Sequence, residues 1–169
     1  ASRRRGSFPA FAVVRFGYTT LRRGLTQVLG RMDNSAKFFR ACRTGNIAMI
    51  QALIAKGVDP DARDEDFLTG LIWAGRKGKI DSAVVLLEHG AEIELGDKRG
   101  RTALFHAATF SRSDFVEYLA SVGANVNPVD SHGCTPLDIA VMEYPKPGEL
   151  VATLEKLGGV HANDLRGEL

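Results

Sequence analysis

The chain has 169 residues, of which 44% are hydrophobic and 25% charged, a balance that is ordinary for a globular protein and argues against wholesale disorder. No apolar run approaches the ~20 residues that a membrane-spanning helix needs. The two cysteines, Cys42 and Cys134, lie far apart, which excludes a disulfide scaffold and a zinc module and favours an intracellular, reducing compartment.

The net charge of +2 conceals two parts of opposite sign. Residues 1–32 contain seven arginines and no acidic residue, whereas the rest of the chain holds the other 15 of the 22 basic residues and all 20 acidic ones. The two parts therefore carry +7 and −5. A split of this size predicts two regions with different functions.

The first predicted region is a basic N-terminal arm over residues 1–32. Its Arg-rich, acid-free composition is typical of organellar targeting segments, yet the chain begins at Ala1 rather than Met. We expect a retained arm that lies on neighbouring subunits of a larger assembly, with a short amphipathic helix over Thr20–Arg31. The alternative is a disordered tail or a targeting remnant. The expected contact residues of the arm are Arg3, Arg4, Arg5, Phe8, Phe11, Arg15, Phe16, Arg22, Arg23 and Arg31.

After the arm, the sequence repeats itself at a period of 33 residues. The stretch "GRTALFHAA" returns as "GCTPLDIA", and a fixed period between 20 and 50 residues is the signature of a stacked-repeat architecture. One repeat cannot bury its apolar face alone, so neighbouring repeats supply the missing core. The positions in register are Ala41, Ala74, Ala107 and Ala140; Leu71, Leu104 and Leu137, with Phe38; Thr69, Thr102 and Thr135; Asp64, Asp97 and Asp130; and Gly57, Gly90 and Gly123.

Each unit predicts two helices and a turn. Thr135 precedes Pro136, which places a hydroxyl N-cap before a proline in the first helical turn. Gly45 and Gly78 end the first helix, and an apolar second helix such as "IDSAVVLLEHG" ends at a glycine suited to a left-handed cap. The linking segments carry Asp and Gly at turn positions. The predicted fold class is therefore all-α.

These phrases resemble the ankyrin repeat. The family phrase D-x-x-G-x-T-P-L-H-x-A-A is matched by "DKRGRTALFHAA" and "DSHGCTPLDIA", and the resemblance covers about residues 35–160. It implies an ankyrin-repeat solenoid of four helix-turn-helix units with hairpin connections over residues 33–160, followed by a tail over 161–169. The expected repeats are 34–62, 63–95, 96–128 and 129–160.

Some positions depart from the family pattern. Phe67 stands where the family has the turn glycine and Gly70 where it has proline, so we expect a distorted turn in the second repeat. Ser111 also replaces a glycine. Two extra residues within Glu143–Glu149 predict a bulged loop between the helices of the fourth repeat.

Several stretches invite a catalytic interpretation that their details exclude. "DPDARDED" begins like a calcium loop, but Arg63 and Asp64 stand where a ligand and a glycine are needed. "GLIWAGRK" has Arg76 where a phosphate-binding loop needs lysine. We therefore expect no catalytic activity, metal or cofactor. The histidines, which never pair at metal-binding spacing, are His89, His106, His132 and His161.

The resemblance implies a non-catalytic scaffold that binds a protein partner on its concave face, where turn tips and inner helices carry recognition. His106 is expected at the surface of this face, and Trp73 as a partly exposed interface anchor. The expected contact residues are Glu65, Asp66, Phe67, Trp73, Arg76, Lys77, Lys98, Arg99, Arg101, His106, Phe110 and His132.

Three interpretations of the whole chain stay open at this point. The first is a protein-interaction module, and the second is a structural subunit of an organellar complex, mitochondrial or plastid, with a cytoplasmic location as the alternative. The third is an adaptor whose Arg-rich arm contacts the phosphates of RNA or an anionic membrane surface.

Overall fold

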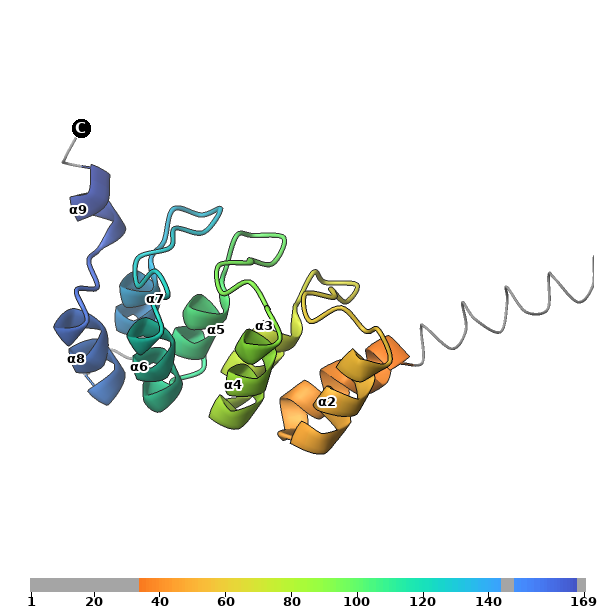
Figure 1. Cartoon of the computed structure of the whole chain (residues 1–169). Helices are drawn as coiled ribbons and strands as arrows, with labels where there is room; N and C mark the ends of the chain where they lie inside the picture. Colours follow the sequence, from red (N-terminus) through yellow and green to blue (C-terminus); the bar gives the residue numbers. More distant parts are fainter. Residues whose placement is uncertain (1–33, 144–147, 167–169) are drawn as a thin grey trace, which may run out of the picture. The chain divides into compact units, whose positions relative to one another are not determined.

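A computed structural model describes residues 34–143 and 148–166, and it separates the chain into two units, 1–34 and 35–169. The second unit is a row of helix pairs (Figure 1). Its described residues contain no strand, only an isolated bridge between Arg63 and Thr69. The helices are 34–44, α2 (Ile47–Ala55), α3 (Gly70–Lys77), α4 (Ile80–Glu88), α5 (Ala103–Thr109), α6 (Ser113–Ser121), α7 (Pro136–Glu143), α8 (Glu149–Lys156) and α9 (Ala162–Arg166).

The helices form an inner row and an outer row. In the inner row α5 packs between α3 and α7, and in the outer row α2 packs on α4 and α6 on α8. Hairpin loops connect each outer helix to the next inner helix, and they project to one side of the stack, at the top of Figure 1. We name them the α2–α3 loop (56–69), the α4–α5 loop (89–102) and the α6–α7 loop (122–135). The predicted all-α solenoid of helix-turn-helix units is confirmed.

The inner helices begin as the threonine column predicts. The hydroxyl oxygen of Thr69 accepts a hydrogen bond from the N–H of Ile72, and that of Thr102 accepts one from Phe105. Both threonines are buried, so without these bonds the first turn would leave amide groups unpaired away from water.

Small residues set the distance between neighbouring repeats. Each alanine of the repeated column is buried. A Cβ at Gly75 would lie 2.8 Å from the backbone oxygen of Ala103, and one at Gly70 would lie 3.0 Å from the Cys42 sulfur. Gly70 therefore starts α3 in place of proline because helix 34–44 packs against it too closely for a side chain.

The expected distortion of the α2–α3 turn is wrong. Phe67 has φ 64°, in the left-handed region where Gly100 has φ 76° in the next repeat. The two turns close with equivalent backbone hydrogen bonds, from Phe67 N–H to the Asp64 carbonyl oxygen in one and from Gly100 N–H to the Asp97 carbonyl oxygen in the other. Ser111 (φ 51°) likewise adopts a glycine conformation. The turn keeps its shape, and the strain lies in the left-handed backbone of residues that carry a side chain.

Two expectations lie outside the described residues. One is the arm over 1–32, including its amphipathic helix, and the other is the bulge within the fourth repeat, where 144–147 are not described. The tail contains a short helix, α9, which is joined to α7 by a hydrogen bond between the His161 ring and Asp138 (2.6 Å).

Candidate functional site

A groove of about 420 Å³ lies between the hairpin loops and the inner helices α3 and α5. Most of the residues that the sequence predicted for partner binding on the second and third repeats line it. We call this hollow the groove. Its lining residues are Asp66, Leu68, Arg76, Asp97, Lys98, Arg99, Arg101, His106, Thr109 and Phe110.

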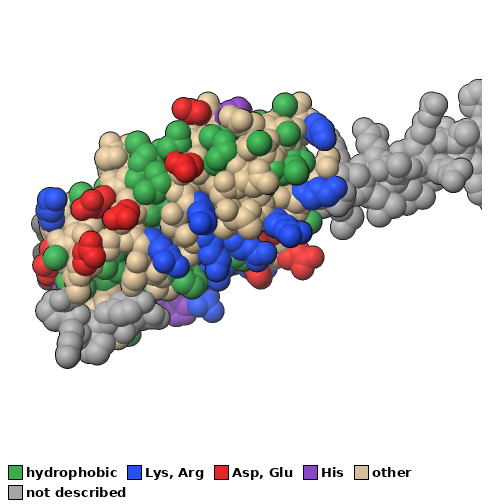
Figure 2. All heavy atoms as spheres, turned by 90° about the horizontal axis from the view of Figure 1, so that it is seen from below, with side chains coloured by type: hydrophobic (Ala, Val, Ile, Leu, Met, Phe, Trp, Pro, Cys, Tyr) green, Lys and Arg blue, Asp and Glu red, His purple; other side chains and the backbone are tan. Residues whose placement is uncertain are grey.

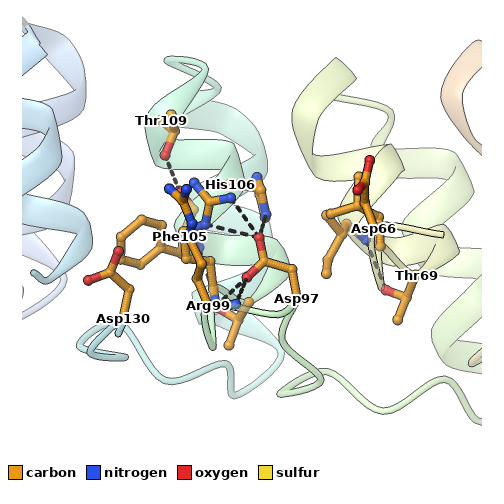
Figure 3. Close-up of polar contacts among 12 residues, drawn as sticks. Asp66, Thr69, Asp97, Arg99, Phe105, His106, Thr109 and Asp130 are labelled. Atoms are coloured by element: carbon orange, nitrogen blue, oxygen red, sulfur yellow. Dashed lines mark hydrogen bonds and ion pairs between the residues drawn. The ribbon is translucent and has the colours of Figure 1, made fainter. Parts of the chain in front are cut away.

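Asp97 holds the groove wall together. One carboxylate oxygen accepts hydrogen bonds from the backbone N–H groups of Arg99 (2.8 Å) and Arg101 (3.1 Å). The other accepts from the Arg101 guanidinium (2.7 and 3.0 Å) and from the His106 Nε2 (3.0 Å). Figure 3 shows His106, on α5, turned toward this carboxylate across the base of the α4–α5 loop. The loop is thereby fixed to the helix that follows it.

The charge states of this cluster follow from its surroundings. Burial alone would raise the pKa of Asp97, but the hydrogen bonds from Arg101 and Arg99 outweigh it and lower the pKa to about 2. Burial and then the Arg101 charge lower the pKa of His106 to about 4, against the opposing effect of Asp97. Near neutral pH a neutral His106 therefore donates from Nε2 to an ionised Asp97.

The expectation that His106 is a surface residue is wrong, because its side chain is only 3% exposed. Its Nδ1 atom is buried and has no hydrogen-bond partner among the described residues. In the neutral tautomer that donates from Nε2, this atom is an acceptor. His106 therefore supports the groove from beneath.

The neighbouring repeat uses the same arrangement with a different donor. One oxygen of Asp64 accepts from the N–H groups of Asp66 and Leu68, and the other accepts from the Trp73 indole N–H at 2.8 Å. Trp73 and His106 therefore share a role, nine residues after the aspartate that each one contacts. In the fourth repeat Asp130 holds its own turn through the N–H of His132.

Arginine and aromatic side chains alternate along the inner helices. The Arg76 guanidinium lies 4.6 Å from the Trp73 ring centre and 4.9 Å from that of Phe110. Arg43 lies over the same tryptophan at 5.6 Å. Such contacts hold a cation in place without neutralising it. Arg76 has no ion pair with any residue that the structure describes, and its Nε atom is buried without a hydrogen-bond partner.

A second aromatic residue lies at the tip of the α2–α3 loop. Phe67 is 46% exposed, and its ring is flanked by Arg63 at 5.7 Å and by Lys98 of the next loop at 5.3 Å. The Lys98 ammonium also donates to the backbone oxygen of Glu65 at 2.6 Å. These contacts join two consecutive loops above the groove.

The remaining predicted contact residues are distributed around the groove. Glu65 is exposed beside Lys98, and the exposed His132 lies on the next loop beside Asp130. Lys77 faces a separate hollow of about 340 Å³, which Arg112 and the acidic Glu149 also line. The predicted arm residues lie outside the described part of the chain.

Sequence reasoning missed residues whose role depends on contacts between repeats. Asp97 had a visible signal in its repeated column, but nothing in the linear spacing indicated that a histidine nine residues later would bind it. No sequence pattern indicated that Arg43 and Arg63 would contact the aromatic residues of the site. Their roles arise only because the stack brings them against Trp73 and Phe67.

Charge changes sign along the stack. Helix 34–44 carries three basic residues and no acidic one, whereas residues 113–143 carry five acidic residues and no Lys or Arg. Viewed from the side opposite the hairpin loops, Lys and Arg side chains gather in the middle and toward the N-terminal repeats, and acidic side chains gather at the other end (Figure 2).

The described residues contain no cluster of three or more His, Cys, Asp or Glu side chains that is arranged to hold a metal ion. Burial raises the pKa of the Cys42 thiol to about 12, so this cysteine is not a nucleophile near neutral pH. None of the described helices combines the length and apolar character that crossing a membrane requires.

Comparison with known proteins gives a consistent result. A family model of ankyrin repeats in three copies matches residues 38–130 and again 71–163. The chain is 34% identical to the B-cell lymphoma 3 protein homolog of Mus musculus over 123 residues, which cover 70% of this chain and 27% of that protein.

Two channel proteins are also similar. A homolog of transient receptor potential cation channel subfamily A member 1 from Caenorhabditis elegans is 32% identical over 64% of this chain and 9% of its own length. The potassium channel AKT2/3 of Arabidopsis thaliana is 29% identical over 59% of this chain and 16% of its own length. The match thus covers only a small part of each relative.

Proposed function

Because this chain belongs to the ankyrin-repeat family, we propose that it is a non-catalytic module that binds a partner protein in the groove. The observation that carries this proposal is Phe67, an exposed aromatic residue at a loop tip with a left-handed backbone. A bulky side chain in that conformation costs of order 1–3 kcal/mol. Exposed, strained aromatic residues beside a groove are typical of recognition sites.

The proposal is tested by affinity purification of the full chain and of Phe67→Gly, each followed by mass spectrometry. Glycine suits the φ of this position, so the variant keeps the turn and loses only the ring. Val122→Ala is the matched control, because Val122 is equally exposed (46%) at the end of an outer helix. We expect the partner to be lost from Phe67→Gly alone. A partner that both variants retain would contradict the proposed site.

The finer proposal concerns the arm. Its seven arginines and interleaved apolar residues support a role in anchoring the chain to neighbouring subunits of a larger complex. Deleting residues 1–32 should release the protein from that complex and leave the repeat unit folded. A complex that the shortened chain still joins would contradict this anchoring.

An organellar location, mitochondrial or plastid, rests on the composition of the same residues. A fluorescent reporter fused to residues 1–32 tests it directly, with a variant in which Arg3, Arg4 and Arg5 are changed to glutamine as the control. A reporter that stays cytoplasmic would contradict the organellar proposal.

The alternative function is an adaptor whose arm contacts the phosphates of RNA or an anionic membrane. The specific observation in its favour is the absence of any acidic residue among residues 1–32. Binding through phosphate contacts falls steeply with salt concentration. Titration of the intact chain against single-stranded RNA and anionic vesicles at two salt concentrations separates this function from anchoring to protein subunits.

A further inference from the structure

The cations of the groove differ in whether the protein already neutralises them. Arg101 is paired with Asp97 at 2.7 Å, and Lys98 lies 3.9 Å from Asp66. Arg76 and Arg99 have no ion pair with any described residue, although both line the groove. Two guanidinium groups are therefore left to bind an anionic group from outside the repeat unit.

The two free cations are positioned differently. Arg76 is held between the Trp73 and Phe110 rings, so little conformational entropy remains for it to lose on binding. Arg99 is exposed at the tip of the α4–α5 loop, where its backbone N–H is fixed by Asp97. An anionic group that enters the groove between the α4–α5 loop and α3 therefore meets Arg99 from the loop and Arg76 from the helix.

The same surface becomes apolar toward the fourth repeat. At one position of the inner helices, successive repeats carry Arg43, Arg76, Thr109 and Met142. Met142 is 72% exposed, and Phe110 beside the groove is 39% exposed. This position of the inner helices is therefore cationic in the first two repeats, and exposed apolar side chains follow it at Phe110 and Met142 in the last two.

This pattern favours a peptide over a nucleic acid. A polyanion with a charge on every residue would pass the acidic Asp66 at the groove rim and would place further charges against the exposed apolar side chains of Phe110 and Met142. A peptide can place its carboxylates on Arg76 and Arg99 and neutral side chains elsewhere. The arm of this chain does not complement the groove, because its seven arginines are positively charged, as Arg76 and Arg99 of the groove are.

We propose that the groove binds an acidic segment of a partner protein, with carboxylates on Arg76 and Arg99 and adjacent apolar side chains on Phe110 and Met142. This inference rests on the proposed function and adds the chemistry and the orientation of the partner. Electrostatic complementarity of this kind sets the register of a complex more than its total affinity.

The test begins with selection of a displayed random-peptide library on the full chain. We expect enriched peptides to carry a block of Asp or Glu next to a block of apolar residues. A synthetic copy of the most enriched peptide is then titrated by fluorescence anisotropy against the chain and its variants.

Arg76→Gln and Arg99→Gln should each lower the affinity for this peptide about tenfold or more, which is the effect of losing a charge-assisted hydrogen bond. Lys56→Gln is the control, since it makes the same charge change at an exposed residue outside the groove lining. Arg99→Gln removes no described side-chain pairing, so its melting curve should match that of the parent chain. Met142→Gln should weaken binding only of peptides that keep their apolar block.

The outcomes separate the inference from the function on which it rests. Enriched peptides without acidic residues, or binding that is insensitive to Arg76 and Arg99, would overturn the inference and leave the groove as a protein-binding site. The absence of any enriched peptide would contradict the proposed function itself. Displacement of the peptide by single-stranded RNA, or self-association that Arg76→Gln abolishes, would assign the groove to RNA or to a second copy and overturn the proposal.

Discussion

The turns of the α2–α3 and α4–α5 loops have the same backbone conformation but different side chains at the tip. Asp64 and Asp97 each accept two backbone N–H groups, and the fourth residue of each turn has a left-handed φ. That residue is Gly100 in one loop and Phe67 in the other. The comparison teaches that the aspartate determines the turn, whereas the tip residue is free to vary and, in the first loop, introduces strain together with an exposed ring.

The two aspartates also differ in what they bind on the inner helix. Asp64 accepts from Trp73, which cannot titrate near neutral pH, and Asp97 accepts from His106 and Arg101. The second cluster is more buried and contains more hydrogen bonds. The third repeat should therefore be the more sensitive of the two to substitution and to acid.

The largest expected effect comes from removing the aspartate itself. Asp97→Ala leaves two backbone N–H groups, Arg101 and His106 without their acceptor, so the free energy of unfolding should fall by about 3 kcal/mol. Asp64→Ala removes fewer bonds at a more exposed site and should cost about 1–2 kcal/mol. Urea denaturation of the two variants measures the difference. Equal losses would show that the Asp97 cluster adds nothing beyond the common turn.

Acid should affect the third repeat through His106. Its pKa in the folded chain, about 4, lies below the ordinary value of 6.5, so the unfolded chain takes up a proton first. The contribution of His106 to the free energy of unfolding is therefore fully present above about pH 6.5 and is lost as the pH falls toward 4, by about 3 kcal/mol.

The control for this pH dependence is His106→Gln, which keeps a donor for Asp97 and cannot titrate. Thermal melting between pH 7 and 4.5 should show a shallower decline in the variant than in the parent chain. The contribution of Asp97 has the same sign, because its pKa is also lowered in the folded chain, but it lies in a more acidic window. It is present above about pH 3.8 and is lost as the pH falls through about 2. Parallel pH profiles for the two chains would contradict a lowered pKa for His106.

A smaller effect is expected when the tip residues are exchanged. A Cβ at Gly100 would find no atom closer than the Val129 oxygen at 3.9 Å, so the first side-chain atom of Gly100→Phe meets no steric obstacle. Its cost should come from the left-handed backbone alone, about 1–2 kcal/mol. Chemical denaturation measures it. A loss of about 3 kcal/mol or more would mean that contacts, and not φ, distinguish the two turns.

The smallest effect on stability is expected for Phe67→Gly. Relief of backbone strain is offset by loss of the contacts with Arg63 and Lys98, which contribute about 0.5–1 kcal/mol each at exposed sites, so the net change should stay within about 1 kcal/mol of zero. A melting curve displaced downward by much more than the corresponding few degrees would make Phe67 a structural residue and weaken its assignment to recognition.

Much of the fold could be predicted because each repeat contains the same local sequence signals. The threonine N-caps, the buried alanine column and the left-handed glycines such as Gly78 act within a few residues of each other. Repetition at a period of 33 then implies stacking. The one incorrect prediction about the backbone, a distorted turn at Phe67, assumed that the side chain would determine φ. The Asp64 hydrogen bonds proved stronger than that preference.

The site was predicted less completely, for a reason that His106 illustrates. Its column placed it on the inner helix, and the structure places it there, but its burial depends on how closely the α4–α5 loop folds back over α5. The distance between this loop and α5 depends on the contacts of Asp97 with Arg101 and His106, and the repeat pattern of the sequence does not indicate that distance.

By itself, the sequence determined the repeat period, the helix starts and the set of charged and aromatic residues that surround the groove. Only the tertiary structure decided which charges are neutralised. Arg101 reaches Asp97 because the loop turns both toward α5, whereas Arg76 is enclosed by the Trp73 and Phe110 rings and meets no acidic residue in the described chain. Pairing requires a few ångströms of proximity in a partly desolvated site. Arg101 gains that proximity when its own loop folds, whereas Arg76 meets Phe110 of the next repeat only when the stack assembles.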